Sequence, residues 1–126
     1  MSVIILAALL GGFGAVCRFL VDNAVTRRTK GIAAIPLGTI IVNVTACLLM
    51  GLLTGWALAH VGESLTPQMR TLLGSGFLGG YSTFSTASVE GARLLRAGRP
   101  WHALVHTGGM LALSMAATGI GLALML

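Results

Sequence analysis

The stretch from Gly74 to Glu90 contains the residue types that could bind a small ion. It opens with glycines and continues with hydroxyl side chains on both sides of Phe84. Its glycines are Gly74, Gly76, Gly79 and Gly80, and the hydroxyl residues around the phenylalanine are Ser82, Thr83, Ser85, Thr86 and Ser88. Each glycine lowers helix propensity by about 1 kcal/mol relative to alanine, whereas hydroxyls can bond to the backbone or to a ligand. We therefore expect two half-helices that meet at Gly79 to Thr83, with free N–H and carbonyl groups suited to ion binding.

Asn43 is a second candidate, because a carboxamide inside an apolar helix costs free energy unless it is hydrogen-bonded. It could clamp two helices together, or it could donate to an ion in a pore. We favour the pore because Thr39, one turn earlier, shares its face.

The last apolar segment carries a stripe at four-residue spacing, formed by His106, Met110, Ser114 and Thr118. This spacing places the four side chains along one helix face, where they could form a polar track. The alternative for the serine and threonine is a bond back to the carbonyl four residues earlier.

Arg18 lies inside or near the end of the first apolar segment, with Asp22 one turn on as a possible partner. It is either an arginine that extends to the membrane interface or a buried structural charge that attracts an anion. Glu90 is expected either to be exposed or to pair with Arg93.

The composition identifies an integral membrane protein of a single domain, residues 1–126. The chain is 56% hydrophobic and only 9% charged, whereas soluble domains average about 25% charged residues. The net charge of +5 comes from short basic clusters, so we expect contact with membrane lipid and no nucleic-acid partner. Cys17 and Cys47 lie in apolar segments and are interpreted as small hydrophobic residues. The first segment is interpreted as a retained helix and not a signal peptide.

The hydrophobic pattern predicts an all-α membrane protein with transmembrane helices at about 3–25, 36–59, 69–92 and 101–126, the third of them broken. Gly51 and Gly55 form a GxxxG pair, which predicts close helix packing. Four helices of this size cannot enclose a pore and also face lipid, so we expect an oligomer, most simply a dimer.

The basic residues predict the orientation of the chain. If four helices span, one side carries only Arg70, while the other carries Arg27, Arg28, Lys30, Arg93, Arg96 and Arg99. By the positive-inside rule, loops 26–35 and 93–100 are cytoplasmic and the chain inserts in one direction. An antiparallel homodimer would require dual topology, so this bias favours pairing with an oppositely oriented homologue.

Three motifs resemble the Fluc (CrcB-type) fluoride channels of bacteria over essentially the whole chain. They are GGFGAVCR at 11–18, GTIIVN at 38–43 and, most specifically, GFLGGYSTFST at 76–86. The resemblance implies an antiparallel dimer in the bacterial inner membrane, with two fluoride pores and passive export of cytoplasmic fluoride, which gives fluoride resistance. It also implies a central structural sodium ion on the backbone carbonyls of Gly79 and Ser82 of both subunits. The pore set predicted from the resemblance and the stripe is Asn43, Phe84, Ser85, Thr86, His106, Ser114 and Thr118.

Some positions depart from the usual family pattern. Ala87 replaces a second phenylalanine, His106 and Met110 replace a tyrosine and a serine, and Ala46 replaces a glycine. These departures leave open a non-conducting partner subunit of a heterodimeric channel. A small proton-coupled multidrug exporter is a further alternative, but its only candidate carboxylates, Asp22 and Glu90, lie near the predicted span ends. No nucleophile–base motif predicts an enzyme.

Overall fold

In a computed structural model, residues 1–62 and 66–126 are described, and their regular elements are all helical. Three helices are long and apolar enough to cross a membrane: α1 (Ser2–Thr29), α2 (Leu37–Ala59) and α6 (Pro100–Met125). The predicted all-α class is therefore confirmed, as are three long apolar helices at the predicted places. Glu63, in the predicted loop between the second and third helices, lies outside the described residues.

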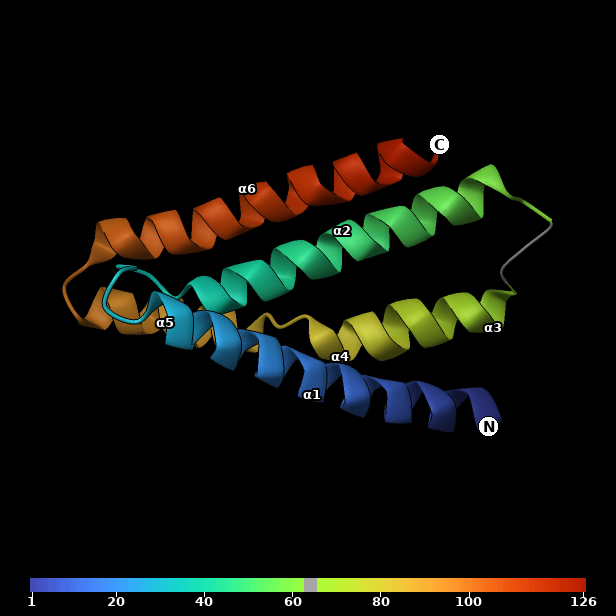
Figure 1. Ribbon diagram of the computed structural model, residues 1–126, viewed down its shortest axis with the longest axis horizontal. Helices are drawn as coiled ribbons and strands as arrows, with labels where there is room; N and C mark the ends of the chain where they lie inside the picture. Colours follow the sequence, from blue (N-terminus) through green and yellow to red (C-terminus); the bar gives the residue numbers. More distant parts are fainter. Residues whose placement is uncertain (63–65) are drawn as a thin grey trace.

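The segment between α2 and α6 is an interrupted helix (Figure 1). It begins with α3 (Pro67–Arg70), passes through the π-helical turns of η1 (Thr71–Leu78) and ends its first half at α4 (Gly79–Tyr81). After a gap of three residues, α5 (Ser85–Arg96) forms the second half. The glycines thus remain helical, and the backbone leaves the helix at Ser82, whose ψ is 160°. The interruption at 82–84 overlaps the predicted stretch, Gly79 to Thr83, only at its last two residues, and it leaves no single long helix here.

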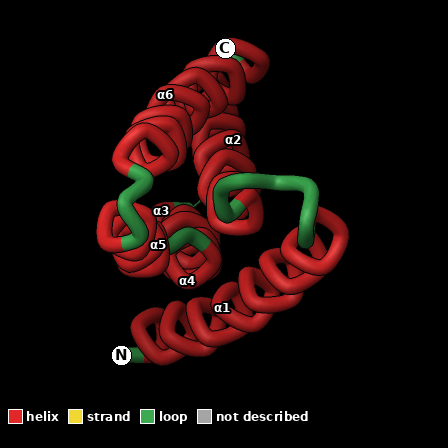
Figure 2. The backbone as a smooth tube through the Cα atoms, turned by 90° about the vertical axis from the view of Figure 1, so that its left-hand side faces the viewer, coloured by secondary structure: helices red, strands yellow, loops and turns green. Residues whose placement is uncertain are grey.

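The helices lie side by side along the long axis of the molecule (Figure 1). In the end-on view, α2 and the interrupted helix occupy the middle, while α1 and α6 flank them on opposite sides (Figure 2). Both termini lie at the same end as the connection between α2 and α3. The break is therefore held in the middle of the bundle, between α1 and α6.

Close glycine contacts fix the distance between α2 and α6. A Cβ added at Gly51 or Gly55 would collide with the backbone of α6 at Thr118 or Leu122. The predicted packing role of this GxxxG pair is confirmed. On the other side of the bundle, a Cβ on Gly80 would collide with the backbone of Gly11 in α1. Small residues let membrane helices approach this closely, which brings the interrupted helix against its neighbours.

The buried core is small and much apolar surface faces outward. Val42, Ala46 and Tyr81 form its centre, and Cys17 packs against them, which agrees with its interpretation as a small hydrophobic residue. Gly14 is the one buried residue of α1. An outward apolar surface of this extent suits contact with lipid or with another subunit.

Candidate ion-binding site at the helix break

Asn43 of α2 holds the break in place through two hydrogen bonds to one residue. Its Nδ2 donates to the Thr83 carbonyl oxygen, and its Oδ1 accepts from the Thr83 backbone N–H, both over 2.8 Å. Thr83 is buried, so these bonds satisfy backbone groups that the interrupted helix leaves without helical partners. The carboxamide therefore acts as a helix-to-helix clamp, the alternative that the sequence left open beside the pore role.

The same side-chain bonds free two backbone carbonyls. In an unbroken helix, the N–H groups of Thr83 and Thr86 would donate to the carbonyls of Gly79 and Ser82. Instead, Thr83 donates to Asn43, and the Thr86 N–H donates to the Thr83 hydroxyl over 3.2 Å. Oxygen atoms without these helical donors are thus left at Gly79 and Ser82, the two positions that the family resemblance implies as sodium ligands.

A groove with a volume of about 500 Å³ opens beside the break, between α2, the break and α6. Asn43, Phe84 and Ser114 of the predicted pore set line it. Phe84 is 86% exposed, so its ring is not held in a core. The full lining is Asn43, Cys47, Ser82, Thr83, Phe84, Leu104, Thr107, Gly108, Met110, Leu111 and Ser114. The groove therefore combines an apolar wall with a few hydrogen-bond donors.

On the side of the groove, the Asn43 amide donates only to a weak hydrogen-bond acceptor. Besides Thr83, its Nδ2 contacts the Met110 thioether sulfur at 3.2 Å. A thioether is a weak acceptor, so an anion that approached Nδ2 could replace it. The methionine in the stripe thus touches the amide without satisfying it as a hydroxyl would.

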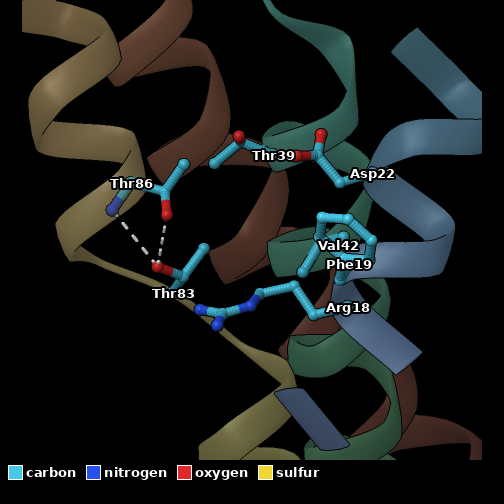
Figure 3. A pocket seen from close by; sticks show the side chains of 7 residues that line it. All are labelled: Arg18, Phe19, Asp22, Thr39, Val42, Thr83 and Thr86. Atoms are coloured by element: carbon cyan, nitrogen blue, oxygen red, sulfur yellow. Dashed lines mark hydrogen bonds between the residues drawn. The ribbon is translucent and has the colours of Figure 1, made fainter. Parts of the chain in front are cut away.

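A smaller cavity of about 160 Å³ lies on the other side of the break, between α1, α2 and α5 (Figure 3). Arg18 extends into it toward Thr83, and Thr86 lines it as well. Arg18 is half-buried. Asp22 lines the same cavity, but among the described residues Arg18 and Asp22 form no ion pair.

The remaining predicted pore residues have different surroundings. Ser85 is exposed, with its hydroxyl 3.4 Å from that of Thr83. Thr118 donates to the Ser114 carbonyl over 3.0 Å and lies 3.4 Å from the Cys47 carbonyl, so it makes the backbone bond considered as an alternative. His106 is fully buried, and it is not among the residues that line the groove.

The expectation for Glu90 was wrong. Its Oε2 is buried and lies 3.3 Å from His106 Nε2, and the side chain is 16% exposed, so among the described residues Glu90 is neither fully exposed nor paired with Arg93. The tight turn after α5 folds this helix back against α6, which brings the two side chains together. The sequence offered a signal for this pairing, because an acid and an imidazole in apolar segments both need polar partners. It did not give the rotation of each helix about its axis.

The long apolar helices and the interrupted helix whose backbone is held by side chains are features of a helical membrane protein. The family described as "CrcB-like protein, Camphor Resistance (CrcB)" matches residues 5–122. A protein of Cutibacterium acnes named fluoride-specific ion channel FluC 2 is 47% identical over 92% of this chain and 91% of its own length. FluC 1 of Leifsonia xyli is 44% identical over 95% of this chain and 84% of its own length. The chain belongs to this family, whose relatives are named as ion channels and not as enzymes.

Proposed function

We propose that this chain is a subunit of a fluoride-selective channel that exports cytoplasmic fluoride passively. The observation that carries the proposal is the family match over nearly the whole chain, to relatives named fluoride-specific ion channels. The groove beside the break supports it, because it holds the donors of Asn43 and Ser114 next to an exposed aromatic ring. Four membrane crossings, with the interrupted helix as the third, complete the proposed subunit in the bacterial inner membrane.

The chemistry of the groove suits a small anion that holds its water tightly. A selective pore must replace this hydration shell without binding the ion so strongly that it stays. In the proposed path, the Asn43 amide exchanges the Met110 sulfur for fluoride, and the edge of the Phe84 ring supplies a weaker positive contact. Ser114 continues the line of donors along α6. Few and weak contacts at each position allow the ion to leave.

A second subunit in antiparallel orientation would close this open groove and bring two breaks together. Fluoride would then pass through pores at the dimer interface. The exposed Phe84 and the outward apolar faces support an interface on this side of the subunit. A partner surface is also needed physically, because a groove open to lipid would leave its few hydrogen-bond donors unsatisfied.

The freed carbonyls of Gly79 and Ser82 fit a structural sodium ion between the subunits. Hard monovalent cations bind oxygen ligands, and unwound backbone in membrane proteins supplies such carbonyls. Each subunit would contribute two oxygens whose helical donors are taken up by Asn43 and Thr83. When bound, the ion would add positive potential near the path of the anion.

Efflux from liposomes tests the proposal directly. Purified chain is reconstituted with internal fluoride or chloride, and release is followed with ion-selective electrodes. We expect rapid fluoride release, either from the chain alone or after addition of an oppositely oriented homologue, and no chloride release above that of protein-free liposomes. Absence of fluoride release, both from the chain alone and with an oppositely oriented homologue, would overturn the channel proposal.

The second candidate function is that of a non-conducting partner in a heterodimeric channel. It is favoured by the one-sided basic loops and by Ala87, which is 2% exposed at a position where the family usually has phenylalanine. A buried alanine here offers no ring to a pore. In this case the chain alone gives no flux, and co-reconstitution with the homologue restores it. The proton-coupled exporter would instead show proton-dependent efflux of cationic compounds.

A further inference from the structure

An acid and an imidazole lie together in the interior, outside the groove. His106 of α6 is fully buried, and its Nε2 lies 3.3 Å from the Glu90 Oε2 of α5. Neither atom completes a hydrogen bond, and His106 Nδ1 also lacks a partner among the described residues. Polar atoms in such surroundings cost free energy unless they are paired. A proton held between the two side chains would satisfy both of them.

Other charged groups lie around the pair. The Thr39 hydroxyl lies close to the Glu90 carboxylate without completing a hydrogen bond. Asp22 of α1 and Arg93 of α5 are the other charged groups that act on Glu90. Lys30 and Arg99 line a cavity together with Glu90, and Arg18 lines the cavity that Thr39 also lines. Arginine and lysine side chains stay charged near neutral pH, so the change in charge of this interior region with pH comes mainly from the protons on Glu90 and His106.

The pair adjoins all three cavities of this region. Thr39 lines the small cavity with Arg18, and Thr107, next to His106, lines the groove. Glu90 also lines a cavity of about 510 Å³ at the end of the bundle that carries the connections from α1 to α2 and from α5 to α6. Water entering that cavity would give protons a route to the carboxylate. His106 lies one position along α6 from Thr107 of the groove lining, so the pair is close to the proposed fluoride path without lining it.

We propose that Glu90 and His106 form a buried proton-binding site whose protonation sets the rate of fluoride flux. The proton site stands on the geometry alone, whereas its effect on flux rests on the proposed function. With one proton the pair has no net charge, and with none it carries −1. The negative state repels fluoride, so flux falls as the pH rises.

Fluoride efflux at several pH values tests the effect on flux. Histidine ordinarily changes charge between about pH 5 and pH 8, so the measurement covers this range and one unit on either side. Protein-free liposomes at each pH remove the contribution of HF, which crosses lipid unaided. A unit charge a few ångströms away is a large barrier at protein dielectric values, so we expect wild-type flux to fall about tenfold or more over the range.

Two variants separate a proton site from a merely structural pair. Glu90→Gln cannot become negative, so its flux should stay near the acidic wild-type value at every pH. His106→Gln removes the imidazole of the pair, so its flux should lose the wild-type change between about pH 5 and pH 8. His60→Gln is the matched control: His60 is exposed and its ring packs at a tilt against Trp56, and its removal should preserve the wild-type pH profile. Equal loss of flux in both pair variants, with the wild-type pH profile kept, would overturn the inference.

A spectroscopic measurement tests the proton site independently of transport. The ring nitrogens of 15N-labelled histidine are followed by NMR in the purified protein, with His60→Gln and His102→Gln used to assign the signals. We expect the His106 signal to titrate and its midpoint to move in Glu90→Gln. If this occurs without fluoride flux at any pH, the proposed function fails and the proton site stands. A His106 signal that does not titrate, or that is unaffected by Glu90→Gln, would overturn the proton site.

Discussion

At the scale of single residues, Asn43 connects the architecture to the proposed chemistry. One face of its carboxamide bonds to the Thr83 backbone, and its second Nδ2 hydrogen points toward the Met110 sulfur. The same group therefore holds the break open and offers a donor to the groove. The two roles weighed for Asn43 at the sequence level are compatible, because an amide has enough donors and acceptors for both.

Asn43→Ala should lower the free energy of unfolding and also remove fluoride flux. It leaves the Thr83 N–H and carbonyl buried without partners, at a cost of about 1–3 kcal/mol for each group. Thermal unfolding in detergent and liposome efflux measure the two effects. Asn23→Ala is the control, since Asn23 is a half-buried amide of α1 with no side-chain hydrogen bond among the described residues. Wild-type stability and flux in Asn43→Ala would contradict the clamp.

At the scale of the elements, backbone-to-backbone packing holds α6 against α2. Gly119 and Gly121 lie two residues apart on α6, but only the Cβ of an alanine at 121 would collide with the α2 backbone, at Leu48. We expect Gly121→Ala to lower the thermal midpoint markedly. In Gly119→Ala, the added methyl group meets open space within the subunit. This variant should leave the free energy of unfolding unchanged or raise it by up to about 1 kcal/mol. Equal midpoints for the two variants would show that α2 and α6 are not packed this closely.

The elements also show what the sequence could predict. Glycine and hydroxyl content predicted a break at Gly79 to Thr83, and the chain leaves the helix at Ser82, among the hydroxyl residues, while Gly79 and Gly80 stay helical. The spacing of Gly51 and Gly55 predicted a contact face in the same way. The pairing of Glu90 with His106 could not be predicted, since it depends on how α5 turns back on α6. Nor could local periodicity show that Thr118 bonds to its own helix while Ser114 lines the groove.

Sodium should stabilise the assembled protein through the break. If the carbonyls of Gly79 and Ser82 bind the ion, the free energy of unfolding rises by about 2.7 kcal/mol at a sodium concentration 100 times the dissociation constant. We expect the thermal midpoint to fall when sodium is replaced by N-methylglucamine, and we expect lithium or potassium to restore it only partly. Ionic strength is held constant in each case. Identical unfolding in sodium and in N-methylglucamine would remove the support for a sodium ion at the break.

At the scale of the whole molecule, the basic residues determine which dimers can form. Both termini lie at the end opposite the two basic connections, so four crossings would place six basic residues on one side and Arg70 on the other. The positive-inside rule then predicts a single orientation, with both termini outside the cytoplasm. An antiparallel dimer of such a chain needs a partner with the opposite bias.

Removing the charge bias should therefore create channel activity in the chain alone. The variant Arg93→Gln/Arg96→Gln/Arg99→Gln loses more than half of the excess of basic residues on one side of the membrane over the other. Reporters fused to its termini should therefore reveal both orientations. Arg70→Gln strengthens the bias and serves as the control with one orientation. If a missing antiparallel copy is what limits the wild type, the triple variant conducts fluoride by itself, while the wild type and Arg70→Gln need the homologue. Mixed orientation of the wild-type chain would instead mean that the protein forms its own antiparallel dimer despite its charges.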